Sequence, residues 1–148
     1  MSKDTRISHS AVETEALGEA WGRSAHAGWV LGLSGDLGTG KTQFVRGLAR
    51  GLGVTTRVSS PTFALVKEYG GGRLPLLHID LYRLETQQQI IRAGLEEYLR
   101  PAGVTVIEWV ERWESLLTSP NAVGVFRRIR IEALQDGSRR IVYEDSGA

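Results

Sequence analysis

The chain of 148 residues contains no cysteine, so it forms no disulfide and offers no thiolate for metal binding or nucleophilic catalysis. It also lacks an apolar leader at its N-terminus and any run approaching about eighteen apolar residues, so we expect no secretory signal and no transmembrane helix. Because chains without disulfides suit a reducing compartment, we expect a cytoplasmic protein.

An excess of charge of one sign is missing as well. The net charge is +1, from 18 basic and 17 acidic residues. This balance argues against a simple, strongly basic nucleic-acid binder, although it permits local basic patches. We expect neither a DNA partner nor a membrane partner.

Internal repeats, heptads and low-complexity segments are also absent. What remains is ordinary for a globular protein, with 41% hydrophobic and 24% charged residues. The length suffices for one core and hardly for two. We therefore expect a single domain over residues 1–148, with no regular element in about the first eight and the last four residues.

Glycine is abundant, and its most informative cluster lies in residues 35–42, which read GDLGTGKT. The string matches G-x-x-x-x-G-K-[ST], the phosphate-binding P-loop. Glycines let the backbone N–H groups of such a loop curl around a polyphosphate without side-chain clashes. Lys41 can reach the β- and γ-phosphates, and the Thr42 hydroxyl can hold Mg²⁺.

The residues around this motif are of the required types. The uncharged run at 29–33 predicts a buried strand that leads into the loop. After it, Phe44, Val45, Leu48 and Leu52 recur at helical spacing, which predicts a helix. The N-terminus of that helix would aim its free N–H groups at the phosphates.

The other expected elements alternate between helix and strand. A capping box at Ser10 opens a helix to about Ala25, with an apolar face of Ala16, Leu17, Ala20 and Trp21. Helical segments are expected at 87–93, 95–99 and 110–117, a strand at 104–107, and hairpins at 63–69 with 74–80 and at 126–134 with 139–144. This order predicts an α/β fold, a single-domain P-loop NTPase-like sandwich with a mixed, partly parallel central sheet and hairpins.

Two carboxylates are candidates to complete the site. Asp80 closes the apolar run LLHID, and Glu108 closes VTVIE, so both lie at the C-terminal ends of expected strands. Ligands of such sheets bind beyond these ends. One carboxylate can serve Mg²⁺ while the other orients water or acts as a general base, and spacing alone does not say which.

Four blocks together resemble the TsaE family, also called YjeE, whose members are the P-loop ATPases of bacterial tRNA threonylcarbamoyladenosine biosynthesis. The blocks are GDLGTGKT at 35–42, SPTF at 60–63, HIDLYR at 78–83 and EW at 108–109. The resemblance spans about residues 10–143. The chain departs from the family at Gln87–Gln89, where acidic residues are usual, and in the stretch after Trp109.

The resemblance implies roles for particular residues. ATP would be bound by Ala11 at the start of the first helix, by Asp36, Leu37, Gly38, Thr39, Gly40, Lys41 and Thr42, by Trp109, and more loosely by Gly137. It assigns Mg²⁺ to Thr42 and Glu108. It leaves Asp80 to activate water, with Lys41 and Thr62 as further catalytic residues, Thr62 from a switch-like loop.

The resemblance also implies partners. Family members dock onto a heterodimer of TsaD and TsaB, in which TsaD transfers threonylcarbamoyl to the adenosine beside the anticodon. ATP turnover would then cycle this assembly, and tRNA contact would occur through it. Two other readings remain: a small-molecule P-loop kinase, and a partner-binding module that uses nucleotide with negligible hydrolysis.

Some residues are interpreted as structural. His78 shares a strand face with Asp80, and we expect it to be a hydrogen-bonded core histidine. The last hairpin carries Arg127, Arg128, Arg130, Arg139 and Arg140. A solvated outer face is favoured there over a tRNA contact.

Overall fold

The computed structural model describes residues 3–35, 39–56, 58, 66–99, 101–113 and 125–145. Within them, seven strands form one sheet in the order β1-β7-β6-β2-β5-β4-β3. The strands are β1 (Lys3–Ser8), β2 (Trp29–Ser34), β3 (Val66–Tyr69), β4 (Leu76–Asp80), β5 (Val104–Glu108), β6 (Val125–Ala133) and β7 (Arg139–Asp145).

The middle of the sheet is parallel and its margins are antiparallel. Strand β2 pairs in parallel with β5 and β6, and β5 pairs in parallel with β4. Antiparallel pairing adds β3 to β4 on one side, and β7 and then β1 beyond β6 on the other. The predicted α/β fold with a mixed, partly parallel sheet is therefore confirmed.

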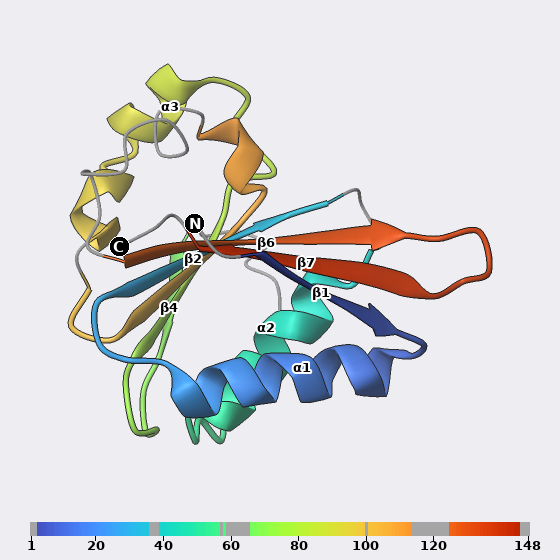
Figure 1. Cartoon of the computed structure of the whole chain (residues 1–148). Helices are drawn as coiled ribbons and strands as arrows, with labels where there is room; N and C mark the ends of the chain where they lie inside the picture. The colour runs from blue at the N-terminus through green and yellow to red at the C-terminus, as the bar shows by residue number, and fades with distance from the viewer. Residues whose placement is uncertain are drawn as a thin grey trace.

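Helices cover both faces of this sheet. Helices α1 (Ala11–Ser24) and α2 (Lys41–Gly51) lie on one face, and α3 (Gln87–Arg92) lies on the other, with the 3₁₀ turns η1 (Leu95–Leu99) and η2 (Val110–Arg112) (Figure 1). In the described part of the chain, no helix is long and apolar enough to cross a membrane.

Alternation along the strands divides the core into two halves. Leu31 and Leu33 of β2 face α2, where Phe44, Val45 and Leu48 pack on them. The other face of the sheet holds a second cluster of apolar side chains: Val30, Ile79, Leu81, Ile90, Leu95, Leu99, Ile107, Val110, Trp113 and Phe126. The uncharged β2 run is buried on both faces, as its composition predicts.

Helix α1 packs on α2 through glycine, and this corrects the apolar face expected for it. Its buried residues are Thr14, Gly18 and Gly22, whereas Ala16 and Ala20 are exposed and Leu17 and Trp21 are half-buried. A Cβ built at Gly18 or Gly22 would lie under 3.0 Å from α2 backbone atoms, and one at Gly47 or Gly51 would meet α1. The missing side chains let the two backbones approach each other closely.

Other expectations differ from the structure in local detail. Residues 3–8 form β1, paired with β7, although no element was expected there. The helix expected at 110–117 begins as a single 3₁₀ turn at Val110–Arg112, and 114–117 lie outside the described residues. The hairpin strand expected from residue 74 begins at Leu76, after Pro75, and its partner's first residues, 63–65, are not described.

Candidate functional site

The P-loop stands between the end of β2 and the start of α2. Strand β2 ends at Ser34, and α2 begins at Lys41 and Thr42 after Gly40, whose left-handed backbone has φ 107°. The strand–loop–helix arrangement that the motif requires is therefore present. Asp36, Leu37 and Gly38 lie outside the described residues, and so does Thr62.

The last hairpin holds the P-loop from one side. A Cβ at Gly35 would clash with the Ile131 carbonyl, so only glycine fits between the loop and β6. From β7, the Arg139 Nε donates to the carbonyl of the buried Thr39 over 3.0 Å. The β6–β7 turn that contains Gly137 thus belongs to a hairpin anchored on the loop.

The start of α1 lies on the loop as well. Ser10 caps this helix by accepting from the Glu13 N–H, and Ala11 is its first residue. Thr14, hydrogen-bonded to Ser8 over 2.8 Å, lies 3.8 Å from the Cβ position of Gly40. The first turn of α1 and the loop therefore form one continuous surface.

Strand register brings the two carboxylates to the P-loop. Asp80 is aligned with Glu108, and Glu108 with Leu33, two residues before Gly35. Both carboxylates lie on the face that α2 covers, since they share it with Val106 and Leu76 of the core beneath that helix. The shared edge expected from the sequence is thereby confirmed, although each carboxylate's role is not.

The surroundings of these two acids differ. Glu108 is 3% exposed, and its Oε2 lies 2.5 Å from Nε2 of the fully buried His78. His78 is therefore a core histidine paired with an acid, as expected. Asp80 is only half-buried.

Asp80 is held by a backbone donor and titrates unusually. Its Oδ1 accepts from the Tyr82 N–H over 3.0 Å. Burial raises the pKa of the Asp80 carboxyl above its ordinary value, with a smaller upward contribution from the Glu108 charge, while the Tyr82 hydrogen bond, His78 and Lys41 oppose the shift. A raised pKa is what a group that accepts a proton near neutral pH requires.

Lys41 and Trp109 contact each other directly. The Lys41 Nζ donates to the Gly35 carbonyl and lies 4.0 Å from the Trp109 ring centroid, within cation–π range. Trp109 has a left-handed backbone, φ 61°, directly after β5. The ring is therefore turned back over the start of α2.

Two acids and bases near the loop were not singled out from the sequence. Glu111 Oε2 accepts from the Gly35 N–H over 3.4 Å, and Arg112 contacts Trp109 and Tyr82. Both lie on η2, in the stretch that departs from the family pattern. Their proximity depends on the turn at Trp109, and no spacing in the sequence signals it.

A divalent cation would suit the donors at this edge. Mg²⁺ prefers oxygen ligands, with one or two from the protein and the rest from phosphates and water. Thr42 supplies a hydroxyl and Glu108 a carboxylate, and His78 keeps that carboxylate fixed. The residues present therefore fit magnesium.

The arginines of the last hairpin are mostly engaged with acids. Arg130 lies 3.3 Å from Glu132 and 3.9 Å from Glu144, and Arg140 lies 3.9 Å from Glu132. Paired charges on a sheet face are what the structural interpretation of these arginines expects.

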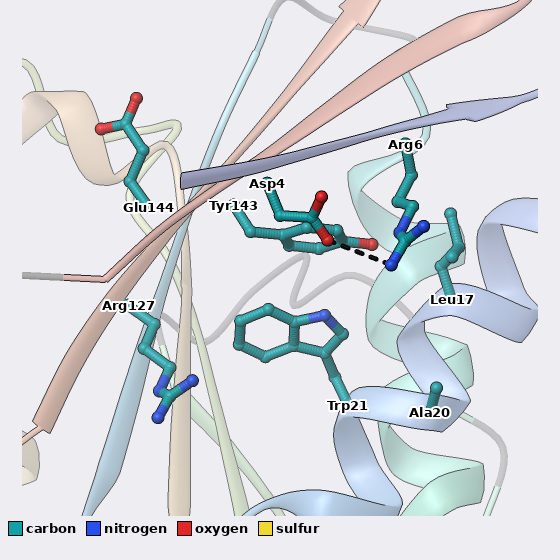
Figure 2. A pocket seen from close by; sticks show the side chains of 8 residues that line it. All are labelled: Asp4, Arg6, Leu17, Ala20, Trp21, Arg127, Tyr143 and Glu144. Atoms are coloured by element: carbon teal, nitrogen blue, oxygen red, sulfur yellow. Dashed lines mark ion pairs between the residues drawn. The ribbon is translucent and has the colours of Figure 1, made fainter. Parts of the chain in front are cut away.

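A separate hollow of about 500 Å³ opens between α1 and the β1–β7–β6 margin (Figure 2). Trp21 stacks on Tyr143 there, and Arg127 lies 4.1 Å over Trp29, at the opposite end of β2 from the P-loop. Asp4 and Arg6 pair with each other across its rim at 3.2 Å. The hollow is therefore distinct from the P-loop site.

A buried parallel strand, a glycine loop ending in Lys41-Thr42 and acids on the next two strands define a P-loop NTPase-like protein. Residues 8–141 match the family described as "Threonylcarbamoyl adenosine biosynthesis protein TsaE". The chain belongs to the TsaE family.

Individual relatives agree with this assignment. The chain is 44% identical over 116 residues to the tRNA threonylcarbamoyladenosine biosynthesis protein TsaE of Bacillus subtilis, covering 78% of this chain and 72% of that protein. It is 42% identical over 135 residues to the TsaE of Treponema pallidum, covering 91% and 96%. The crystal structure of Bacillus subtilis YdiB superposes with a TM-score of 0.81 at 34% identity, covering 99% of this chain and 87% of that one.

Proposed function

We propose that this protein is a magnesium-dependent ATPase that serves tRNA threonylcarbamoyladenosine biosynthesis. The observation that carries the proposal is the convergence of the P-loop lysine with Asp80 and Glu108 at one edge of the sheet. The names of the relatives supply the pathway.

In this proposal the loop and the first turn of α2 bind the triphosphate. The backbone N–H groups at the start of α2 have no partner within the helix, so they are suited to phosphate oxygens. Lys41 would leave the Gly35 carbonyl and contact the β- and γ-phosphates. Ala11 and Gly137 would then flank the base, while Trp109 remains beside Lys41.

The two carboxylates take different roles because their surroundings differ. Glu108 is buried and paired with His78, which favours a fixed metal ligand alongside the Thr42 hydroxyl. Asp80 is half-buried with a raised pKa, which favours acceptance of a proton from the attacking water. Magnesium, when bound, would neutralise charge that develops on the phosphates. Thr62 is proposed to approach the γ-phosphate.

We further propose that TsaB and TsaD are the partners and that hydrolysis cycles their assembly. A P-loop with one metal commonly turns over slowly until a partner completes the site. Slow hydrolysis by the protein alone and stimulation by the partners are therefore expected. Any tRNA contact would arise within that assembly.

The decisive experiment measures ATP hydrolysis with and without purified TsaB and TsaD, followed by tRNA modification over several turnovers. Stimulated hydrolysis together with dependence of modification on this protein supports the proposal. Phosphate transfer to a nucleoside or sugar acceptor would instead establish a kinase. ATP-dependent docking without phosphate release would establish a binding module.

A further inference from the structure

Arg112 of η2 contacts both segments that leave the carboxyl edge of the sheet. Its Nη1 donates to the Tyr82 carbonyl and, over 3.1 Å, to the Leu84 carbonyl. Both acceptors lie in the segment that follows β4. Arg112 itself belongs to the segment that follows β5, so its guanidinium ties the two together.

The same guanidinium also packs on two aromatic rings. It lies 5.2 Å from the Trp109 ring centroid and 5.4 Å from that of Tyr82, and these rings lie 5.2 Å from each other. Both distances are within cation–π range. One planar group therefore fixes a cluster of Tyr82, Trp109 and Arg112.

This cluster supports a backbone conformation that needs support. Among the described residues other than glycine, Trp109 alone has a positive φ, at 61°. Such a conformation is costly for a bulky residue and persists only where surrounding contacts hold it. The Arg112 N–H donates to the Trp109 carbonyl over 3.0 Å, and its guanidinium packs on the ring, so Arg112 acts on both parts of this residue.

The cluster also reaches Asp80. Tyr82 accepts from Arg112 through its carbonyl and donates through its N–H to the Asp80 carboxylate over 3.0 Å. A shift of Tyr82 would therefore move the donor that orients this acid.

We infer that Arg112 is a positioning residue that holds Trp109 against Lys41 and, through Tyr82, orients Asp80. An arginine is required because a planar fork donates to two carbonyls and stacks on two rings at once, which a lysine ammonium cannot do. The part concerning Asp80 rests on the proposed ATPase function. The part concerning Trp109 does not.

The test labels the full-length protein with 5-fluorotryptophan and follows its fluorine NMR spectrum. The chain has four tryptophans, and the Trp109 resonance is assigned by its absence in Trp109→Phe. In Arg112→Lys the Trp109 resonance should move or broaden, while those of Trp21 and Trp29 stay in place and report an intact fold. Arg92→Lys, an exposed position on α3, is the matched control and should leave all four unchanged.

Hydrolysis in the presence of the partners gives the second readout. Arg112→Lys should lower kcat by about 10-fold and leave KM within about 3-fold, because orientation of the acid rather than ATP binding is lost. An unmoved Trp109 resonance in both Arg112→Lys and Arg112→Ala would overturn the inference. If the wild type hydrolyses no ATP, the proposed function fails, and the resonance still decides the role of Arg112.

Discussion

The glycines of the P-loop and the glycines of the α1–α2 crossing differ in backbone conformation. Gly35 and Gly40 have positive φ, 142° and 107°, at the edge where the proposed chemistry takes place. Gly18, Gly22, Gly47 and Gly51 lie inside regular helices, where they remove bulk between two backbones. One region uses glycine to shape a site and the other uses it to pack the fold, so their substitutions should separate activity from stability.

The largest expected effect is loss of activity at the P-loop. Lys41→Ala should reduce ATP turnover by about 10³-fold or more, since it removes the cation next to the phosphates. Its unfolding free energy should change by no more than about 1 kcal/mol, because one hydrogen bond to Gly35 is lost. Steady-state hydrolysis and urea titration measure the two effects. Undiminished turnover would remove Lys41 from the site.

The crossing should show the opposite behaviour. Gly47→Ala places a methyl group against the Glu15 carbonyl, and we expect a loss of about 3 kcal/mol in unfolding free energy from overpacking. Gly70→Ala, where a Cβ has open space, is the control and should stay within about 0.5 kcal/mol. Equal losses in the two variants would mean that the helices do not approach as closely as the structure places them.

Within the site, Asp80 is expected to affect turnover without affecting nucleotide binding. Asp80→Asn keeps an acceptor for the Tyr82 N–H but does not accept a proton, so hydrolysis should slow by about 10²-fold. ATP affinity, measured by calorimetry, should be nearly unchanged. Wild-type turnover in this variant would make Asp80 a structural residue.

Glu108 should be distinguished by the metal. Glu108→Gln keeps a polar partner for His78 but weakens a magnesium ligand, so Mg²⁺-dependent ATP binding should fall by about 10-fold. Binding measured in EDTA should change less. Equal losses with and without Mg²⁺ would show that Glu108 does not hold the metal.

The smallest expected effect is a pH-dependent gain in stability. Because burial raises the pKa of Asp80 in the folded protein, its ionised form destabilises the fold at pH values above that pKa. Asp80→Asn should therefore be more stable than the wild type at neutral pH. This advantage should shrink as pH falls through the raised pKa and vanish below about 3.8, the unfolded value. A constant advantage at all pH values would point to a cause other than ionisation.

Several elements were predictable because their signals are local. The buried run of β2, the apolar spacing of α2, the glycine-centred turn before β4 and the turn at Asp136-Gly137 each depend on neighbouring residues, and each agrees with the structure. Asp80 and Glu108 were found for the same reason, as acids that close apolar strands. Their shared edge follows from the parallel pairing of β4 and β5.

Other features depended on contacts between distant segments. Strand β1 is short and carries Lys3, Asp4 and Arg6, so its composition does not mark it as a strand; pairing with β7 makes it one. The buried side of α1 was wrongly predicted because hydrophobic spacing ignores glycine, which buries backbone rather than side chain. The roles of Glu111 and Arg112 follow from the left-handed turn at Trp109.

The sequence by itself determined the P-loop, the order of strands and helices and the two acids, because these depend on residue type and short-range spacing. The tertiary structure alone decided that His78 partners Glu108, that Arg139 bonds the Thr39 carbonyl and that Arg112 joins Tyr82 to Trp109. These contacts connect residues far apart in the chain, and only the register of the sheet and the turns at its edge bring them within bonding distance.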